Sequence, residues 1–515
     1  MNQALFSSVD YSLLLMYLVV VVGIGLWVGR GQKDTEDYFL AGRSMGWFPI
    51  GISTIASLYS AISYMGTPSE YRTYDLKLTV GLLSMIPTAV VVMYVFMPFY
   101  HRLQVFSAYE YLEKRFNVTV RALASAIFVV WRILWMGTAV YVPSLVLHTI
   151  TDFPLIPMIL CMGVIATLYT VVGGMKAVIW TDVIQFFVLS GGSVLALWVV
   201  SSHTSGFSGI WSLAEQGGRT QILDWSLDPT IRITTWGALM GALVANLAMY
   251  GADQVSVQRY LAAGSLKGMQ KSFVLNTVGG WFMAMLMIWI GLGLYAFYTI
   301  NPGLLPETIG GDKVFPYFIA TQIPIGLRGV MIAAILAAAM SSIDSGLNSC
   351  ATALITDFFK RFGWLTRWTS RDSQDSAGRE LRISRILTLA LGVLVTVLAC
   401  FVGALGSIIE ITNKLVNSFA GPMLGIFVLG MLTRKTESRG AFVGLLGGTL
   451  VTAFCIIENY PSFMWFGPIG AFVTVLAGKV TSRFFGGDDA ERPDLVFQFG
   501  RSRTSEGVSA ENPES

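Results

Sequence analysis

"GVMIAAILAAAMSSIDSGLNSCATALITDFF", residues 329–359, is the stretch that decides the fold. It is long and apolar enough to cross a bilayer, since a helical span needs about 20 apolar residues. Its centre nevertheless holds three serines, an aspartate and an asparagine. On a helix, Ser341, Asp344, Ser345 and Asn348 share one face, with Ser342 beside them. Such a face belongs inside a bundle of membrane helices and not against lipid.

The chain around this stretch is apolar throughout. Its 515 residues are 54% hydrophobic and 13% charged, with a mean hydropathy of +0.64. A soluble domain carries about 25% charged residues, so we expect a polytopic all-α membrane protein in contact with lipid. A net charge of +3 is too small to indicate nucleic-acid binding. Four cysteines without a CxxC pair and three scattered histidines predict neither a Cys/His metal centre nor an enzyme.

The hydropathy pattern predicts about thirteen transmembrane helices. The run at 11–29 has no basic residue before it and no small-residue cleavage site after it, so we expect it to be a retained span and not a signal peptide. The tail after 482 is polar and is expected to be disordered. The predicted spans are 11–29, 47–70, 78–99, 121–148, 154–173, 179–200, 236–257, 272–299, 325–357, 384–404, 408–432, 439–458 and 463–482.

The basic residues predict the orientation, because lysine and arginine favour cytoplasmic loops. Arg132 and Lys414 lie inside spans, and most of the others, Arg259 included, fall in alternate connections that begin after the first span. We therefore expect a plasma-membrane protein, in a bacterium the inner membrane, with its N-terminus outside and its C-terminus in the cytoplasm. The opposite connections hold only Arg72, Lys77, Arg219, Arg232, Lys313 and Arg328.

Two of the predicted spans have polar, glycine-containing interruptions. One is "GWFPIGISTIASLYSAISYMGTPSEYRTY" (46–74), and the other is "GALMGALVANLAMYGADQVSVQRY" (237–260). A helix broken at membrane depth is tolerated where it lines a cavity or is buried in protein. The two lie five spans apart and so run in opposite directions, which is typical of inverted repeats with a central binding site. The alternative is that small residues only let helices pack closely.

The polar face of 337–348 predicts a cation site. A carboxylate in the bilayer costs roughly 2.5–3.5 kcal/mol, so Asp344 needs a partner. Hydroxyl, carboxylate and carbonyl oxygens suit Na⁺ or H⁺, and a broken span 47–70 frees carbonyls near Ala56 and Tyr59, with Asp182 as a second acid. The alternative is structural: the serines bond to carbonyls four residues back, and Asp344 pairs with Arg132 or Lys414.

Four motifs, in order, resemble those of the sodium/solute symporters, a family that includes sugar, sialic acid, proline, iodide, multivitamin and monocarboxylate carriers. They are "TEDYFLAGRSMGWFPIGIS" (35–53), "LYTVVGGMKAVIWTDVIQ" (168–185), "SSIDSGLNS" (341–349) and "GMLTRKTESRGAFVGLLGG" (430–448). The resemblance implies an inverted-repeat fold of five plus five helices with one leading and two trailing helices. The expected units are 1–46, repeats at 47–204 and 236–432, an outer loop at 205–235, trailing helices at 433–482 and a cytoplasmic tail at 483–515.

The resemblance also implies ligands for one or two Na⁺, with no organic cofactor. A first sodium site would use the carbonyls of Ala56, Tyr59 and Ala338 with the hydroxyls of Ser341 and Ser342. A second, which only some members have, would use Asp182, Ser341, Asp344 and Ser345. Where sialic acid carriers have serine, this chain has Asp344, so a protonated carboxyl is the alternative to the second Na⁺.

The expected substrate is a small organic solute, most simply an organic anion such as a monocarboxylate or sugar acid. The arginine with which sialic acid carriers hold the substrate carboxylate aligns with Trp135, and their second-helix glutamine aligns with Leu82. Arg132, one turn earlier, either meets a carboxylate or pairs with an acid. The resemblance places the substrate among Leu58, Ser60, Ser63, Leu82, Trp131, Trp135, Thr138, Asn246 and Tyr250.

The sequence thus predicts Na⁺-coupled import of a solute by alternating access. A sodium/sugar or sialic acid symporter and a H⁺-coupled porter are alternatives. From another class, a transporter-like sensor module would need a signalling domain larger than the short tail. A channel would need a continuous polar pore, whereas the polar residues here cluster at mid-depth on a few helices.

Overall fold

The computed structural model describes residues 7–30, 32–151, 153–364, 376–403, 408–484 and 495–497. These residues are almost entirely helical, and their one extended pairing is an isolated bridge between Met45 and Ala263. The main elements are α1 (Ser8–Val28), α2 (Thr35–Leu40), α3 (Trp47–Leu58), α4 (Ala61–Thr73), η2 (Lys77–Ser84), α5 (Met85–Val91), η3 (Val92–Phe96), α6 (Met97–Leu103), α7 (Glu110–Arg115), α8 (Val118–Thr151), α9 (Leu155–Ser202), α10 (Gly206–Gln216), α11 (Thr235–Gly251), α12 (Gln254–Leu261), α13 (Leu266–Ile300), α14 (Val314–Gln322), α15 (Arg328–Ala353), η6 (Leu354–Lys360), α17 (Ser376–Val402), α18 (Ile408–Leu432), α19 (Ser438–Glu458), η8 (Phe463–Trp465) and α20 (Phe466–Phe484).

The expected all-α membrane class is confirmed, but the count of thirteen spans is not. Nine of the described helices are long and apolar enough to cross a membrane, and ten if the bent pair α3–α4 counts as one span. One reason is that α9, with 48 residues, contains both predicted spans 154–173 and 179–200, which meet at a kink at Gly174, where φ is 57°. Glycine adopts this left-handed conformation without strain, so the chain turns there without a loop. In addition, α11 has only 17 residues, and α18 contributes only the shorter apolar stretch Ser418–Leu432.

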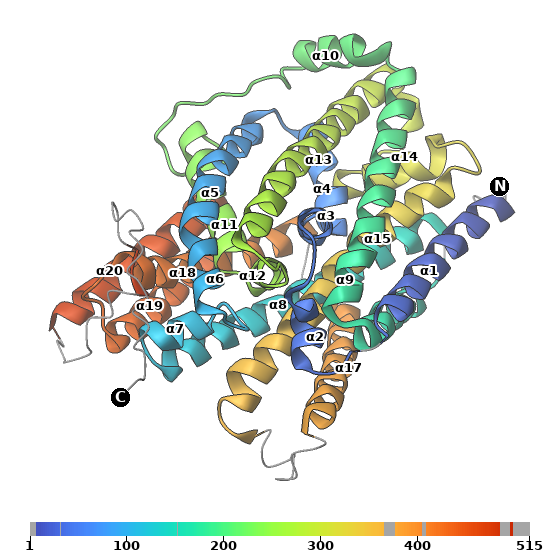
Figure 1. Ribbon diagram of the computed structural model, residues 1–515. Coiled ribbons are helices and arrows are strands. Elements are labelled where there is room, and N and C mark those ends of the chain that lie inside the picture. The colour runs from blue at the N-terminus through green and yellow to red at the C-terminus, as the bar shows by residue number, and fades with distance from the viewer. Residues whose placement is uncertain are drawn as a thin grey trace, which may run out of the picture.

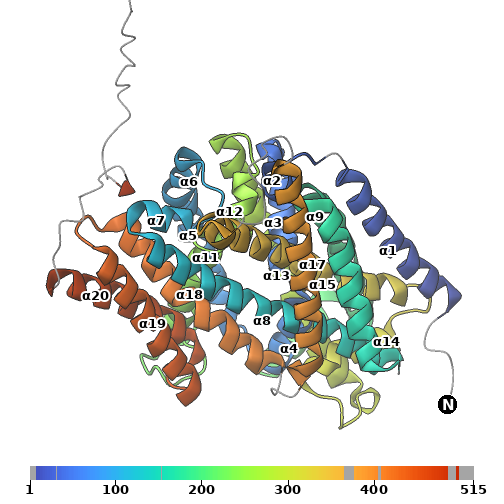
Figure 2. The same cartoon turned by 90° about the horizontal axis from the view of Figure 1, so that it is seen from below.

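The helix with the serine-rich face, α15, forms the centre of the bundle. Within its apolar window 94% of the residues are buried, against 17% for α1 and 28% for the window of η8 and α20. Figures 1 and 2 show α1 at one edge of the molecule and α19 and α20 at the opposite edge. α15 packs against α9, α8, α1, α3 and α4. At Gly192 of α9 an added Cβ would lie only 2.6 Å from the Cβ of Ala334, so these two helices approach more closely than ordinary side chains permit.

Both helices that the sequence predicts to be interrupted are broken. α3 ends at Leu58, and α4 leaves it at an angle of 63° after the non-helical residue Tyr59. α11 ends at Gly251, and Asp253 caps the start of α12. The repeat boundaries at 47–204 and 236–432 stay predictions.

Most of the expected disordered tail lies outside the described residues. The exceptions are 483–484, at the end of α20, and 495–497. The Tyr111 hydroxyl donates to the Leu495 carbonyl at 3.0 Å, and the amide of Phe497 donates to the Met431 carbonyl at 2.7 Å. This short segment is therefore docked on α7 and α18.

Candidate cation and substrate sites

The break between α3 and α4 places backbone carbonyls beside the serines of α15. Continuing the helix would have capped the carbonyls of Ala56 and Ser57 with amides four residues on. Instead, the Ser341 hydroxyl donates to the Ala56 carbonyl at 3.0 Å, and the Ser342 hydroxyl donates to the Ser57 carbonyl at 3.3 Å. Both hydroxyls also lie 3.3 Å from the Ala338 carbonyl. We call these five oxygens the α3–α15 oxygen cluster.

The chemistry of this cluster fits a monovalent hard cation. All five oxygens are uncharged, and all five residues are at most 5% exposed. In the ion's absence each hydroxyl gives its proton to a carbonyl; with Na⁺ between them, both kinds of oxygen would turn lone pairs to the ion. Ala56, Ala338, Ser341 and Ser342 were expected from sequence. Ser57 was not, and Tyr59 ends α3 with ψ of 80° and an amide bonded to the Ile55 carbonyl.

A second polar cluster surrounds Asp182 on α9. Its Oδ2 accepts hydrogen bonds from the Ser53 hydroxyl at 2.6 Å and from the Arg259 guanidinium at 2.8 Å. The same guanidinium contacts the Ser345 hydroxyl. Asp344 accepts from the Tyr169 hydroxyl at 2.8 Å and from its neighbour's amide. The positively charged guanidinium of Arg259 therefore lies between Asp182 and Ser345, where Na⁺ was expected.

The position of Arg259 differs from the one expected from sequence, which placed this residue in a cytoplasmic loop. It lies in α12 with 0% of its surface exposed, because Asp182, Ser53 and the Val255 carbonyl satisfy its donors. Two carboxylates and one guanidinium leave this cluster one negative charge in excess. Among the described residues, Oδ1 of Asp182 has no hydrogen-bond partner.

A pocket of about 470 Å³ lies beside the break, between α4, η2, α11, α13 and η8. Leu58 and Tyr59 form part of its wall, so the segment that supplies carbonyls to the cluster also shapes the pocket. Among the described residues, its lining contains tyrosine, serine, threonine and asparagine side chains but no lysine, arginine or acid. Such a pocket suits a mostly apolar solute with a few hydrogen-bonding groups.

The structure gathers six of the nine expected substrate residues around this pocket: Leu58, Ser63, Leu82, Trp135, Asn246 and Tyr250. The other three lie elsewhere. Ser60 caps α4, Thr138 bonds to the Leu134 carbonyl, and Trp131 stacks on Phe419 at 4.3 Å between ring centres. The pocket also has walls that the sequence did not predict, from Thr277 and Trp281 of α13 and from Phe463 and Met464, since nothing in an evenly apolar span marks its inward face.

The segment after α10 is tied to elements that line the pocket. Arg232 binds Glu70 through two bonds of 2.7 Å, and its guanidinium lies 3.8 Å from the ring centre of Tyr74. Lys77 binds Asp224 at 3.1 Å, and this hydrogen bond lowers the pKa of Asp224. These contacts join the segment to the end of α4 and the start of η2.

At the other end α12 closes the bundle. All eight residues of this helix are buried. Asp253 at its start is paired with Arg132 of α8, which answers the question left by the sequence: Arg132 pairs with an acid. Gln258 donates to Asn348 at 2.6 Å and to Thr352 at 2.9 Å, both on α15. Nearby, Arg121 binds Asp357 at 2.6 Å. The described residues at this end are therefore closely packed and leave no evident opening.

A broken-helix bundle with a buried oxygen cluster beside a pocket is the arrangement expected of a membrane carrier. The comparisons with known proteins agree. A model of the sodium:solute symporter family matches residues 38–448, and the chain belongs to that family.

Individual relatives cover nearly the whole chain. A sodium/sialic acid symporter of Aliivibrio fischeri is 30% identical, over 94% of this chain and 95% of its own. A human sodium/iodide cotransporter is 32% identical, over 86% of this chain and 69% of its own. A solved Na⁺-coupled sialic acid symporter, in a substrate-bound outward-open state, superposes with a TM-score of 0.86 at 30% identity, covering 93% of this chain and 98% of that one.

These findings confirm the family, the symporter fold and the class of transporter as opposed to enzyme. The protein is an integral membrane, Na⁺-coupled symporter of a small-molecule solute. Between the two substrate expectations, the comparisons favour the sialic acid alternative over the monocarboxylate.

Proposed function

We propose that the α3–α15 oxygen cluster binds the Na⁺ that drives uptake, and that the pocket beside it binds the solute. One observation carries the proposal: the break at Tyr59 serves both sites. Na⁺ would pull the carbonyls of Ala56 and Ser57 towards α15 and thereby fix Leu58 and Tyr59 in the pocket wall. Affinity for the solute then depends on Na⁺, and affinity for Na⁺ depends on the solute to the same extent.

The second cluster accepts one further monovalent cation, Na⁺ or H⁺, at Asp344. Arg259 already balances one of the two carboxylates, and the orphaned Oδ1 of Asp182 together with Asp344 leaves one negative charge to neutralise. Asp344→Asn removes that charge without changing the shape of the side chain. The Hill coefficient for Na⁺, or the pH dependence of uptake, should fall towards that of a single-ion carrier. If neither changes, Asp344 is structural.

The candidate solute is an acidic sugar of the sialic acid class. Its support is that two relatives aligned over almost the full length of this chain are sialic acid symporters. The second candidate is a smaller or less polar organic anion, which the pocket favours because its lining has no arginine or lysine to hold a carboxylate. Asn246, whose amide donates to Ser84 at 3.0 Å, and the hydroxyls of Ser63 and Thr67 are available to bind polar atoms, together with the tyrosines of the lining.

The experiment is thermal unfolding of the purified protein against a panel of sialic acids, neutral sugars, monocarboxylates and amino acids, each with Na⁺ and with choline. Stabilisation by a sialic acid only when Na⁺ is present supports the first candidate. Stabilisation by a monocarboxylate alone supports the second. Stabilisation by a solute that is equal in choline, with uptake that follows pH, would replace Na⁺ coupling by H⁺ coupling.

The orientation in the membrane follows from charge. We propose an outside N-terminus and a cytoplasmic C-terminus, which puts α10 and the mouth of the pocket outside and α2 and α12 at the cytoplasmic face. In this arrangement Na⁺ and solute enter from the outside, and α12 is the gate that must open to release them inward.

A further inference from the structure

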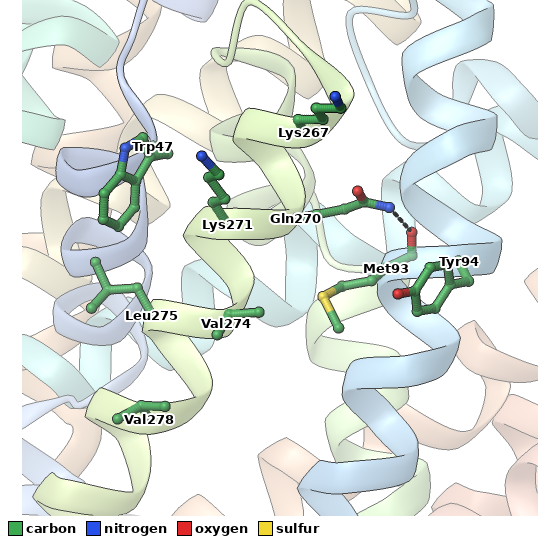
Figure 3. Close-up of a pocket in the computed structure, with 9 residues that line it drawn as sticks. All are labelled: Trp47, Met93, Tyr94, Lys267, Gln270, Lys271, Val274, Leu275 and Val278. Carbon is green, nitrogen blue, oxygen red and sulfur yellow. Dashed lines mark hydrogen bonds between the residues drawn. The ribbon is translucent and has the colours of Figure 1, made fainter.

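A groove on the outside of the bundle lies between the start of α3, the turn η3 and the first half of α13. It has a volume of about 650 Å³ and opens to the surface. Figure 3 shows Lys267 and Lys271 towards one end of α13, with Val274, Leu275 and Val278 following along the helix away from them. Trp47 stands on the α3 side, and Met93 and Tyr94 stand across the groove on η3.

The π-helical turn η3 and a hydrogen bond from α13 shape the groove. η3 is a single turn of π-helix, which widens its helix locally. The side-chain amide of Gln270 crosses from α13 and donates to the Met93 carbonyl at 3.1 Å. This bond holds the two walls at a fixed separation.

The long part of the groove is apolar and faces outward. Val274 is 50% exposed, Val278 61% and Tyr94 62%. In an integral membrane protein such a surface meets hydrocarbon, so its natural occupant is an acyl chain and not a water-soluble ion.

The polar end of the groove is positive. Lys267 and Lys271 are exposed, lie one turn apart on the same face of α13, and form no ion pair with any described residue. No acid lines the groove. Trp47, near the level of Lys271 in Figure 3, is a residue type that collects at the boundary between hydrocarbon and water.

We propose that this groove binds an anionic phospholipid. The phosphate lies between the two ammonium groups, and one acyl chain runs along Val274, Leu275 and Val278. An anionic headgroup is favoured over a zwitterionic one because the latter brings its own cation to a place that already holds two. With the orientation proposed above, the lipid belongs to the cytoplasmic leaflet, where a basic pocket between helices is an expected headgroup site.

The test is native mass spectrometry of the full chain in uncharged detergent, with phosphatidylglycerol or phosphatidylcholine of the same acyl chains added. Wild type should retain phosphatidylglycerol in preference. The Lys267→Gln/Lys271→Gln variant should need about thirtyfold more phosphatidylglycerol for the same occupancy, since each of the two lysines near a charged lipid surface contributes about 1 kcal/mol and about 1.4 kcal/mol is tenfold. The control Lys33→Gln/Lys176→Gln removes the same charge from exposed lysines outside the groove and should match wild type.

Equal loss in both double variants, or equal retention of the two lipids, overturns the proposal. Displacement of the lipid by inorganic phosphate alone would reassign the lysines to a free anion. A second readout is independent of overall charge: phosphatidylglycerol brominated on its acyl chains should quench fluorescence in wild type more than in Trp47→Phe. The variants are compared only if their melting temperatures and their stabilisation by Na⁺ match wild type.

Discussion

Ser342 is the residue on which the primary cation proposal is most directly testable. Ser342→Ala removes one of five oxygens from the α3–α15 oxygen cluster while keeping the helix. We expect the Na⁺ concentration for half-maximal uptake to rise about tenfold, the effect of losing one ligand worth about 1.4 kcal/mol. The measurement is initial uptake in proteoliposomes against Na⁺.

The matched control is Ser349→Ala, on the same helix and equally buried but with a hydroxyl that has no partner in the described residues. Its Na⁺ dependence should stay that of wild type. An unchanged Na⁺ dependence in Ser342→Ala, with normal expression, would remove Ser342 from the ligand set.

Arg259 and Asp182 form a fully buried ion pair, so each should be harmful to remove alone. Breaking such a pair leaves an uncompensated charge and costs about 3–5 kcal/mol, whereas neutralising both partners costs much less. We expect Arg259→Gln and Asp182→Asn each to lower the melting temperature strongly, and the double variant to recover part of the loss. Additive losses in the double variant would show that the pair is not coupled.

At this scale the sequence predicted Asp344 and its serine neighbours because polar residues stand out in an apolar run. It missed Arg259 for the opposite reason. Gln254, Gln258 and Arg259 are polar residues at the end of a span, a pattern shared with any loop, and only the tertiary packing places them inside.

Among the elements, α12 is the one whose movement the proposed transport cycle requires. Its start is tied to α8 through Asp253 and Arg132, and Cys350 of α15 lies buried beside that pair. Asp253→Asn weakens the ion pair with Arg132, so α12 should move away from α8 and α15 more often. In a variant retaining Cys350 as the single cysteine, we expect several-fold faster labelling by a water-soluble maleimide.

Na⁺ should slow this labelling, because ion binding between α3 and α15 favours the state in which α12 is closed. The comparison is with Glu70→Gln, which weakens a pair at the opposite end of the pocket. If Glu70→Gln accelerates Cys350 labelling as much as Asp253→Asn does, loosening is general and α12 is no gate.

Helix breaks were predictable from sequence. Small polar residues and Pro68 mark the break between α3 and α4. In α9, the glycine pair at 173–174 falls between the predicted spans 154–173 and 179–200, and the two helical halves of α9 meet there at a non-helical kink at Gly174. Hydropathy gives the length of apolar runs, but it does not show that the two runs join through this kink without a loop.

For the whole molecule the number of ions sets how far the solute can be concentrated. Each Na⁺ that moves inward gains roughly 2.3 kcal/mol per 100 mV. A tenfold Na⁺ gradient adds about 1.4 kcal/mol. In liposomes clamped at zero potential, the logarithm of the solute ratio should rise linearly with the logarithm of the Na⁺ ratio. The slope should equal the number of coupled Na⁺ ions, because a coupled H⁺ does not contribute to it.

A slope near two in wild type and near one in Asp344→Asn would assign the second cation as Na⁺. A slope near one in both, with uptake that also follows a pH gradient, would assign it as H⁺. A slope of zero in wild type would remove Na⁺ coupling at the cluster altogether.

The fold of the whole molecule was predictable because four motifs and two broken helices agree. The solute was not predictable, because an apolar pocket wall discriminates weakly between related molecules.

The docked segment 495–497 has a practical consequence for anyone labelling this carrier. A fluorescent reporter that replaces the chain after residue 484 would delete the carbonyl that accepts from the Tyr111 hydroxyl and the amide that donates to the Met431 carbonyl, and it would remove the buried side chain of Leu495. A reporter attached beyond residue 497 keeps those contacts, so brightness and transport should both survive there when they decline together in the shorter fusion.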